Sequence, residues 1–273
     1  MASESHAVTA NNARIVYEMA GQGEPVVLIH GFTLDMSMWD DQMSALTPHF
    51  TVIRYDARGF GQSSTPLEQY THHDDLNALL DVLEIPSAHI IGLSMGGGIA
   101  LRFACIYPQR VRSLVLVDST LPGHPMAEET AARMGDAYAA AREHGLDAAR
   151  ATWLAHPLFE AARERPDLAP RLATIVDRYS GWHWLNHEPA SELDPPVTTR
   201  LHQFTTPTLV VVGERDIPDF HAFARRLAAD IPGGELAIIP NAGHMTNMEA
   251  PDSFNEVVLG FLLRQRQPES VSR

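Results

Sequence analysis

Short runs of consecutive apolar, often β-branched residues most constrain what this chain can fold into. The runs VVLI, HIIG, LVLV and TLVVVG are apolar on consecutive positions, which is typical of strands that helices cover on both faces. Segments of helical period lie between them, so a mostly parallel sheet of the α/β class is expected. The predicted strands span residues 14–19, 25–30, 51–55, 88–92, 111–118, 208–213 and 235–239, and the predicted helices include 74–83, 96–107 and 220–229.

Residues 121–203 break this alternation of strands and helices. Strand-like runs are missing there, and Ala-rich helical segments such as EETAARMGDAYAAAREHG alternate with prolines. The stretch is too long for an ordinary connection inside a compact domain. We therefore expect a core domain of residues 1–120 and 204–273, with residues 121–203 inserted as a helical cap over one end of the sheet.

The charge and the N-terminus limit the partners of this chain. It carries 34 acidic and 20 basic residues, for a formal net charge of −14, and no Lys/Arg cluster. Nucleic acid is therefore not an expected partner. The N-terminus lacks a basic region followed by an apolar one, and no apolar run approaches the length of about 18 residues that a membrane span needs. These features predict a soluble, cytoplasmic protein with no membrane partner.

Neither of two possible metal-binding features is expected to form a metal site. Cys105 is the only cysteine, which excludes a disulfide framework and the usual thiolate clusters, and its apolar neighbours predict a buried structural thiol. The run HHDD at residues 72–75 follows Thr71, which predicts a capped helix start. Adjacent residues on a helix point in different directions, so this run is a poor set of metal ligands.

The stretch IIGLSMGGG at residues 90–98 predicts a nucleophile. A buried strand must turn abruptly into a helix there, and Gly92 and Gly96 permit the strained backbone at the apex. The apex side chain then lies beyond the carboxyl edge of the sheet, at a helix N-terminus that can stabilise a developing anion. Ser94 is thus the candidate nucleophile. The GxSxG pattern alone also fits a plain turn. Whether Ser94 is a nucleophile therefore depends on whether a base and an acid occur in the required chain order.

His244 is the candidate base. A serine hydroxyl is a poor nucleophile near neutral pH and needs a base, normally a histidine. His244 follows the last predicted strand and precedes the final helix, which places it at the same sheet edge as Ser94. His30 precedes Ser94 in the chain and belongs to the loop that is predicted below to form the oxyanion hole. His183 and His187 lie in the expected cap, where packing or exposure is the simpler interpretation.

Asp216 is the candidate carboxylate that orients the histidine. It directly follows the strand VVVG and gives the chain order Ser, Asp, His that this kind of site requires. Asp118 also ends a predicted strand and is the main alternative. Chain order and proximity to the histidine loop favour Asp216. Asp219 and Glu214 are weaker candidates.

Two backbone amides are predicted to form an oxyanion hole. The elbow supplies the N–H of Met95, and a loop after an early strand supplies the N–H of Phe32. Gly31 allows the backbone of that loop to approach the substrate closely. A histidine–glycine pair after a strand also fits a plain turn. Because Ser94 is the candidate nucleophile, an oxyanion hole is the better interpretation of this pair.

Taken together, these segments resemble the α/β-hydrolase superfamily, of the single-domain esterase, perhydrolase and enol-lactonase kind. The resemblance covers nearly the entire chain. It implies an eight-stranded, mostly parallel sheet with an early antiparallel strand, a cap after the sixth strand, and chemistry without metal or cofactor. It also implies a structural turn near the site, made of Asp56, Arg58, Gly59 and Gly61. The motifs that carry it are HGF at 30–32, DARGFGQS at 56–63, GLSMGG at 92–97, YPQRVRSLVLVD at 107–118, GERD at 213–216 and AGH at 242–244.

The expected function is hydrolysis of small to medium uncharged carboxylic esters through an acyl-enzyme. Dehalogenases and epoxide hydrolases of this fold use an aspartate at the elbow, where this chain has Ser94. Trp182 and Trp184 either line the substrate pocket or pack the cap onto the core. The other residues expected to form the pocket and its apolar wall are Gly31, Phe32, Met95, Leu121, Met126 and Met245.

Two alternatives stay open at this point. One is hydrolysis of an enol-lactone or of a carbon–carbon bond, which uses the same triad. An anionic lactone would favour an arginine from the cap, and the candidates are Arg133, Arg142, Arg163 and Arg178. The other is a non-catalytic small-molecule binding protein on the same fold, which the intact elbow, acid and base disfavour. The sequence leaves open whether the chain forms a homo-oligomer.

Overall fold

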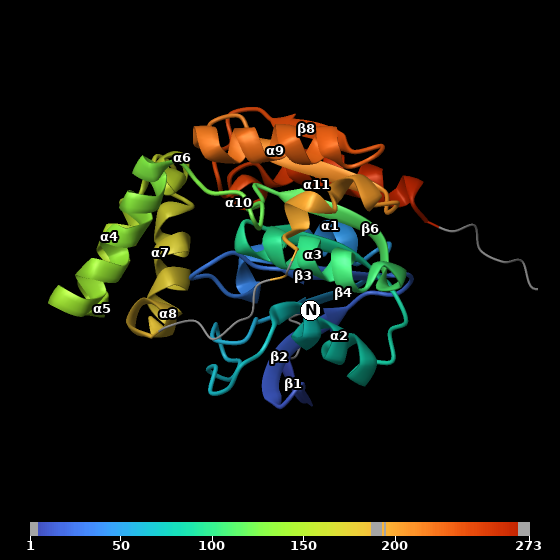
Figure 1. Ribbon diagram of the computed structural model, residues 1–273, viewed down its shortest axis with the longest axis horizontal. Coiled ribbons are helices and arrows are strands. Elements are labelled where there is room, and N and C mark those ends of the chain that lie inside the picture. The colour runs from blue at the N-terminus through green and yellow to red at the C-terminus, as the bar shows by residue number, and fades with distance from the viewer. Residues whose placement is uncertain (1–4, 187–192, 194, 267–273) are drawn as a thin grey trace, which may run out of the picture.

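An eight-stranded sheet organises the computed structural model, which describes residues 5–186, 193 and 195–266 (Figure 1). The strand order is β1-β2-β4-β3-β5-β6-β7-β8. Strands β4, β3, β5, β6, β7 and β8 pair in parallel, whereas β2 is antiparallel to both β1 and β4. The α/β class and the mostly parallel eight-stranded sheet are therefore confirmed. The strands are β1 Ser5–Ala10, β2 Ala13–Ala20, β3 Pro25–Ile29, β4 Thr51–Tyr55, β5 Ala88–Leu93, β6 Val111–Val117, β7 Thr208–Gly213 and β8 Glu235–Ile239.

Seven strands match the predicted runs within one or two residues, but the residue patterns did not predict β1. Its sequence SHAVTA lies at the sheet edge with only Ala10 fully buried. An exposed edge strand needs no apolar run, so it leaves little signal in the sequence. By contrast, every residue of β5 and of β7 is buried, as expected for strands covered on both faces.

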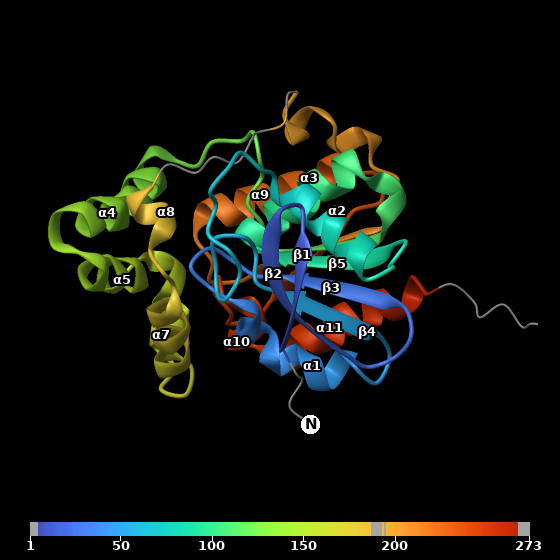
Figure 2. The same cartoon turned by 90° about the horizontal axis from the view of Figure 1, so that it is seen from below.

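Helices cover both faces of the sheet (Figure 2). Helices α1 and α11 lie on one face, and α2, α3 and α9 lie on the other. The Thr71 hydroxyl accepts a hydrogen bond from the Asp74 amide at 3.1 Å, which confirms the predicted cap of α2. The helices of these layers are α1 Asp40–Leu46, α2 His72–Val82, α3 Met95–Ile106, α9 Pro218–Asp230 and α11 Pro251–Arg264, with the short α10 Thr246–Glu249 before α11.

Residues 121–203, here called the helical segment, follow β6 and precede β7. Their longer helices lie beside the sheet and outside both helix layers (Figures 1 and 2). The part of the segment that the structure describes contains no strand. His187 and the rest of 187–192, together with residue 194, lie outside the described residues. The helices are α4 Glu128–His144, α5 Leu146–Leu154, α6 Glu160–Arg163, α7 Ala169–Arg178 and α8 Trp182–Leu185.

Burial differs sharply between the sheet and the outer helices. Trp39, Phe103 and Phe254 are fully buried around the strands, whereas α4 buries only Ala137 and Ala141. Dense packing of this kind favours a rigid site, so the sheet is a better support for one than α4. None of the described helices is both long and apolar enough to span a bilayer.

Candidate active site

Ser94 lies at a sharp turn between β5 and α3. Its backbone has φ 55° and ψ −112°, a conformation that is strained for any residue with a side chain. A Cβ on Gly92 would lie 2.2 Å from the Gly96 carbonyl oxygen, and a Cβ on Gly96 would lie 2.2 Å from the Ile29 carbonyl oxygen. The two glycines are thus required by close backbone approach, as the sequence predicts. Ser94 itself is half-buried, so its hydroxyl faces a space that a small molecule can enter.

His244 and Asp216 are joined by a buried hydrogen bond. His244 Nδ1 lies 2.9 Å from Asp216 Oδ2, and the other carboxylate oxygen of Asp216 accepts from the Ile217 amide at 2.7 Å. The loops after β7 and β8 bring the two residues together. When Nδ1 donates to the carboxylate, Nε2 is the nitrogen that can accept a proton from a hydroxyl. Ser94 and His244 line the same cavity.

Asp118 lies behind this pair and does not take the place of Asp216. It is fully buried, and its Oδ1 accepts from the Gly213 amide at 2.8 Å. Burial, followed by the charge of Asp216, raises the pKa of Asp118 well above its ordinary value. Two carboxylates this close do not both ionise readily, and the raised pKa favours the protonated form of Asp118. The structure therefore pairs His244 with Asp216, as chain order predicts.

These three side chains also form the one cluster of potential metal ligands within the described residues. Ligand atoms of Asp118, Asp216 and His244 lie within 4.8 Å of one another. Their chemistry fits a metal ion poorly, because a metal needs a deprotonated carboxylate and a free imidazole nitrogen. Here Asp118 has a raised pKa and His244 Nδ1 is bonded to Asp216. The cluster suits the orientation of a proton-transfer group better than metal ligation.

Glu249 holds the histidine loop on both sides of His244, a role that the sequence analysis missed. It is almost completely buried, and its two carboxylate oxygens accept from the Gly243 amide at 2.5 Å and the Met245 amide at 3.1 Å. Burial raises the pKa of Glu249. The only sequence signal is an acidic residue among the apolar positions of HMTNMEAP.

His30 braces the loop that follows β3. The Ala57 amide donates to His30 Nε2 at 3.0 Å, so Nδ1 carries the hydrogen and donates to the Gly31 carbonyl at 2.8 Å. Burial lowers the pKa of His30, which is consistent with this neutral form. His30 thus fixes the start of the Gly31–Leu34 loop and contributes no proton transfer.

Two backbone amides at the cavity are available to a ligand. Phe32 follows Gly31 in this loop, and Met95 is the first residue of α3. Both residues line the cavity together with Ser94. Within the described part of the chain, neither amide donates to a protein acceptor. An unpaired N–H at such a place is suited to binding an oxygen that gains negative charge.

The cavity is small and apolar. Its volume is about 160 Å³. The described residues outside the helical segment, here called the sheet domain (5–120 and 204–266), and the helical segment both contribute to its wall, and His244 is the one basic side chain among its lining residues. The lining residues are Gly31, Phe32, Leu34, Leu93, Ser94, Met95, Thr120, Met126, Met134, Tyr138, Trp153, Leu158, Phe159, Phe220, His244 and Met245.

Three residues expected in the pocket lie elsewhere. Trp184 is fully buried against Tyr179, with ring centroids 5.0 Å apart, and Trp182 packs on His183. Leu121 lines a neighbouring hollow. The tryptophans thus pack the helical segment, and the tryptophan that lines the cavity is Trp153 of α5. A lone tryptophan in an Ala-rich helix gave no signal of that role.

The four arginines considered as partners for an anionic substrate do not line the cavity. Arg133 pairs with a glutamate one turn earlier on α4 at 3.0 Å. Arg163 donates to two backbone carbonyls, and Arg178 pairs with Asp35. Arg142 is exposed. The lining therefore offers no guanidinium to a substrate carboxylate.

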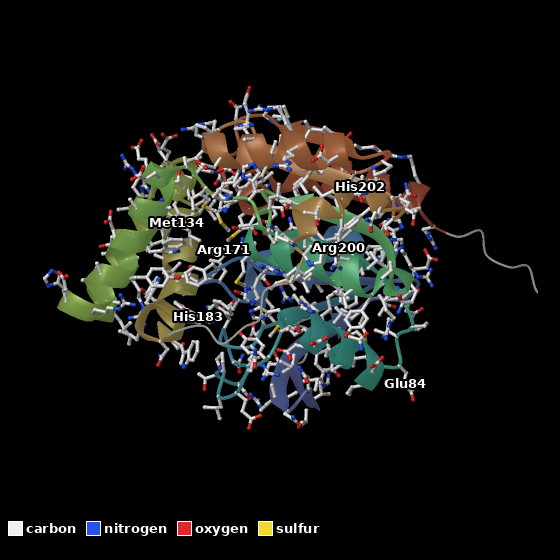
Figure 3. The ribbon with its side chains drawn as sticks, in the orientation of Figure 1. Glu84, Met134, Arg171, His183, Arg200 and His202 are labelled. Carbon is white, nitrogen blue, oxygen red and sulfur yellow. The ribbon has the colours of Figure 1, made fainter. Side chains whose placement is uncertain are left out.

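Polar contacts join the helical segment to the sheet domain. Arg171 pairs with Asp41 at 2.5 Å. Asp219, a weak candidate for the catalytic acid, instead accepts from the Ala127 amide and the Thr130 hydroxyl at 2.6 and 2.7 Å. Figure 3 shows Met134, Arg171 and His183 on the side of the segment that faces the sheet domain.

The other acidic residues near the sheet edge have structural roles. Glu214 accepts from the Asn241 amide at 2.9 Å. Asp56 accepts from the Met36 and Gln62 amides at 2.9 and 2.8 Å, and Arg58 pairs with a buried aspartate of α2. Gly59 and Gly61 have positive φ values. The turn at residues 56–61 is thus a scaffold beside the site.

Comparison with known proteins agrees with this architecture. Residues 24–200 match a family model described as the alpha/beta hydrolase fold. The chain is 29% identical to 3-oxoadipate enol-lactonase 2 of Acinetobacter baylyi, over 94% of this chain and 96% of that protein. It is 30% identical to the 2-hydroxy-6-oxononadienedioate/2-hydroxy-6-oxononatrienedioate hydrolase of Comamonas testosteroni, over 92% of each chain.

A solved structure is similar over nearly the full length. The thermophilic esterase of Thermogutta terrifontis superposes with a TM-score of 0.74 at 26% identity, over 97% of this chain and all of that one. The three relatives carry an enol-lactonase, a hydrolase and an esterase name, so they agree on hydrolysis and differ in substrate.

Proposed function

Because this chain belongs to the alpha/beta hydrolase family, we propose that it is a serine hydrolase that cleaves small, uncharged carboxylic esters through an acyl-enzyme. The observation that carries the proposal is the shared cavity of Ser94 and His244, with Ser94 at a strained elbow and His244 bonded to Asp216.

In the proposed acylation step, Ser94 Oγ attacks the acyl carbon while His244 Nε2 takes its proton. Asp216 keeps the imidazole in the required tautomer and stabilises the imidazolium. The amides of Phe32 and Met95 hold the oxyanion of the tetrahedral intermediate. The intermediate then expels the alcohol, which leaves with the proton from His244.

In the second step, water repeats the attack on the acyl-enzyme. His244 removes a proton from the water, and the resulting tetrahedral intermediate expels Ser94 Oγ, which regains its proton from His244. The carboxylic acid product leaves, and the site returns to its starting protonation state. The helical segment serves as a cap that encloses the acyl group during both steps.

The cavity supports a small acyl group without charge. An apolar cavity of ~150 Å³ holds a molecule the size of benzene, and the cavity here is about 160 Å³. An acyl chain of a few carbons or one ring therefore fits. A carboxylate on the acyl group would lose its hydration without gaining a cation, which is unfavourable.

An uncharged lactone is a second candidate substrate, because an enol-lactonase is among the relatives that match over nearly the whole chain. A lactone is an internal ester and needs the same catalytic groups. The apolar lining disfavours substrates that carry carboxylates, whether lactones or the dienedioates named for another relative.

A substitution at Ser94 tests the proposal. Ser94→Ala should abolish turnover of p-nitrophenyl acetate while the melting temperature stays close to that of the parent protein. The parent, but not the variant, should be labelled by a fluorophosphonate probe. Retained turnover would refute the nucleophile assignment, and an unlabelled, inactive parent would instead support a binding protein. A panel of uncharged esters and lactones should then show which ring or chain is preferred.

A further inference from the structure

The loop that carries the Phe32 amide contains a tight turn with a threonine in an unusual backbone conformation. The Leu34 amide donates to the Gly31 carbonyl at 3.2 Å, which makes a four-residue turn. Its third residue, Thr33, has φ 64° and is completely buried. Turns with a positive φ at that position normally place glycine or asparagine there, and a β-branched residue is a genuine outlier. The surrounding contacts must therefore hold Thr33 in this conformation.

The contact that does so comes from the helical segment. The Trp153 indole N–H donates to Thr33 Oγ1 at 2.8 Å, and the Thr33 hydroxyl donates in turn to the Phe32 carbonyl at 2.6 Å. Both the donor and the acceptor capacity of the hydroxyl are used in this chain of hydrogen bonds. The bonds orient the peptide plane directly after Phe32.

Ring packing from the same direction reinforces this contact. Five aromatic rings contact the Phe32 ring, and four of them belong to the helical segment. The Trp153 ring meets it edge to face, with centroids 5.5 Å apart. The Phe32 side chain and the following carbonyl are thus both fixed by residues of the segment.

We propose that Trp153 is a positioning residue that holds the Phe32 amide in the oxyanion hole through Thr33. The inference rests on the serine hydrolase function proposed above. It makes the helical segment part of the catalytic machinery as well as a cover for the acyl group. Misplacing an oxyanion donor weakens transition-state binding more than ground-state binding, so the effect should fall on kcat.

Trp153→Phe tests the hydrogen bond, since it keeps an aromatic ring in the cavity wall and removes the N–H. We expect kcat to fall about tenfold with KM changed less than twofold, a smaller effect than the ~10²–10³ for loss of an oxyanion donor. The Ki of an alkyl trifluoromethyl ketone, whose adduct carries an oxyanion, should rise by the same factor. The Ki of the matching unreactive amide should stay unchanged.

Trp184→Phe is the matched control. Trp184 is a buried tryptophan of the same segment that does not line the cavity. Its indole nitrogen has no hydrogen-bond partner within the described residues. This variant should keep kcat and both Ki values. If it lowers kcat as Trp153→Phe does, the effect is a general loosening of the segment and the inference fails.

Substitutions at Thr33 test the other end of the bond. Thr33→Val, which removes the hydroxyl, should match Trp153→Phe, and the double variant should be no worse than either single one. Thr33→Ser, which keeps the hydroxyl, should retain most of kcat. Additive losses, or a loss confined to KM, would overturn the role of Trp153. Ser94→Ala, run in parallel, separates the two proposals: turnover that survives it refutes the hydrolase mechanism itself.

Discussion

The sheet domain and the helical segment are held in place by different kinds of interaction. In the sheet domain, Ser94 and Asp216 follow β5 and β7, every residue of which is buried, and His244 is itself buried on a loop after the edge strand β8. The helical segment instead meets the sheet domain through ion pairs such as Arg178–Asp35 and Arg171–Asp41, several members of which are partly exposed. The aromatic residues of the helical segment contact the active site at the Phe32 ring.

This difference separates chemistry from selectivity. A buried leucine contributes ~2–5 kcal/mol to the free energy of unfolding, whereas a partly exposed ion pair contributes ~0.2–1 kcal/mol. The catalytic groups are thus fixed by strong packing, and the cavity wall is attached by weaker contacts. Substitutions of the catalytic groups in the sheet domain should change rates by orders of magnitude, and those in the helical segment, apart from Trp153, should change preference or attachment.

The largest expected effect distinguishes the two buried aspartates at the ends of β6 and β7. Asp216→Asn should lower kcat by ~10³–10⁴, because the amide favours the wrong tautomer of His244. Asp118→Asn should keep most of the activity, since the raised pKa of Asp118 favours the neutral carboxyl that an asparagine resembles, and steady-state kinetics compare the two variants.

Asp118→Asn should also stabilise the protein near neutral pH. The raised pKa of Asp118 means that the unfolded chain loses this proton at lower pH than the folded one, so the unfolding free energy falls as pH rises above ~4. The asparagine variant should lack this fall in urea unfolding at several pH values. Equal losses of activity in the two variants would contradict the assignment of Asp216.

A substitution in the wall should change preference instead of chemistry. Met134 of α4 lines the cavity, and Met134→Ala should shift the preference for kcat/KM toward longer acyl chains by roughly tenfold or more, since each methylene is worth ~1–3 kcal/mol. The activity toward acetate esters should fall little. Ala131→Gly, on the exposed side of α4, is the control, and a uniform loss for all chain lengths would speak against Met134 as a size filter.

The helical segment should respond to mild acid. Burial, then the charge of His244, lowers the pKa of His156 to about 4. The unfolded chain takes up this proton near pH ~6.5, so His156 should make the unfolding free energy fall as pH drops from about 6.5 towards 4. His156→Gln should flatten this part of the pH profile, and an unchanged slope would contradict the burial of a neutral His156.

The smallest effect is expected at the contact between the two regions. Arg178→Met should lower the unfolding free energy by less than ~1 kcal/mol, because the arginine of this pair is half exposed. The difference from the parent should shrink further as salt screens the pair. If chemical unfolding instead shows that the unfolding free energy falls by several kcal/mol, the ion pairs hold the helical segment far more firmly than expected.

The sequence predicted the sheet domain better than the helical segment for a physical reason. Buried parallel strands leave long apolar runs, and an elbow at positive φ requires glycines at fixed spacing, so β3 to β7 and Ser94 were predictable. The cavity wall depends on which side of each outer helix packs inward. Ala-rich helices carry little of that information, and so Trp153 was missed while Trp182 and Trp184 were candidates.

The roles of the buried carboxylates could not be predicted from the sequence either. Asp118 and Asp216 both follow neighbouring strands, β6 and β7, and only their surroundings show that Asp216 bonds His244 whereas Asp118 is the acid with the raised pKa. Glu249 lies five residues after His244 and folds back on its loop through a short helix. Nothing in residue spacing indicates such a return.

The most direct test of the central claim is to locate the nucleophile chemically. The parent protein should be treated with a small organophosphate ester and digested, and the modified peptide identified by mass spectrometry. The predicted result is one phosphoryl group on Ser94. The Asp216→Asn variant should be labelled much more slowly than the parent. A stoichiometric adduct on any other residue, or none at all from a protein that hydrolyses p-nitrophenyl acetate, would contradict the account.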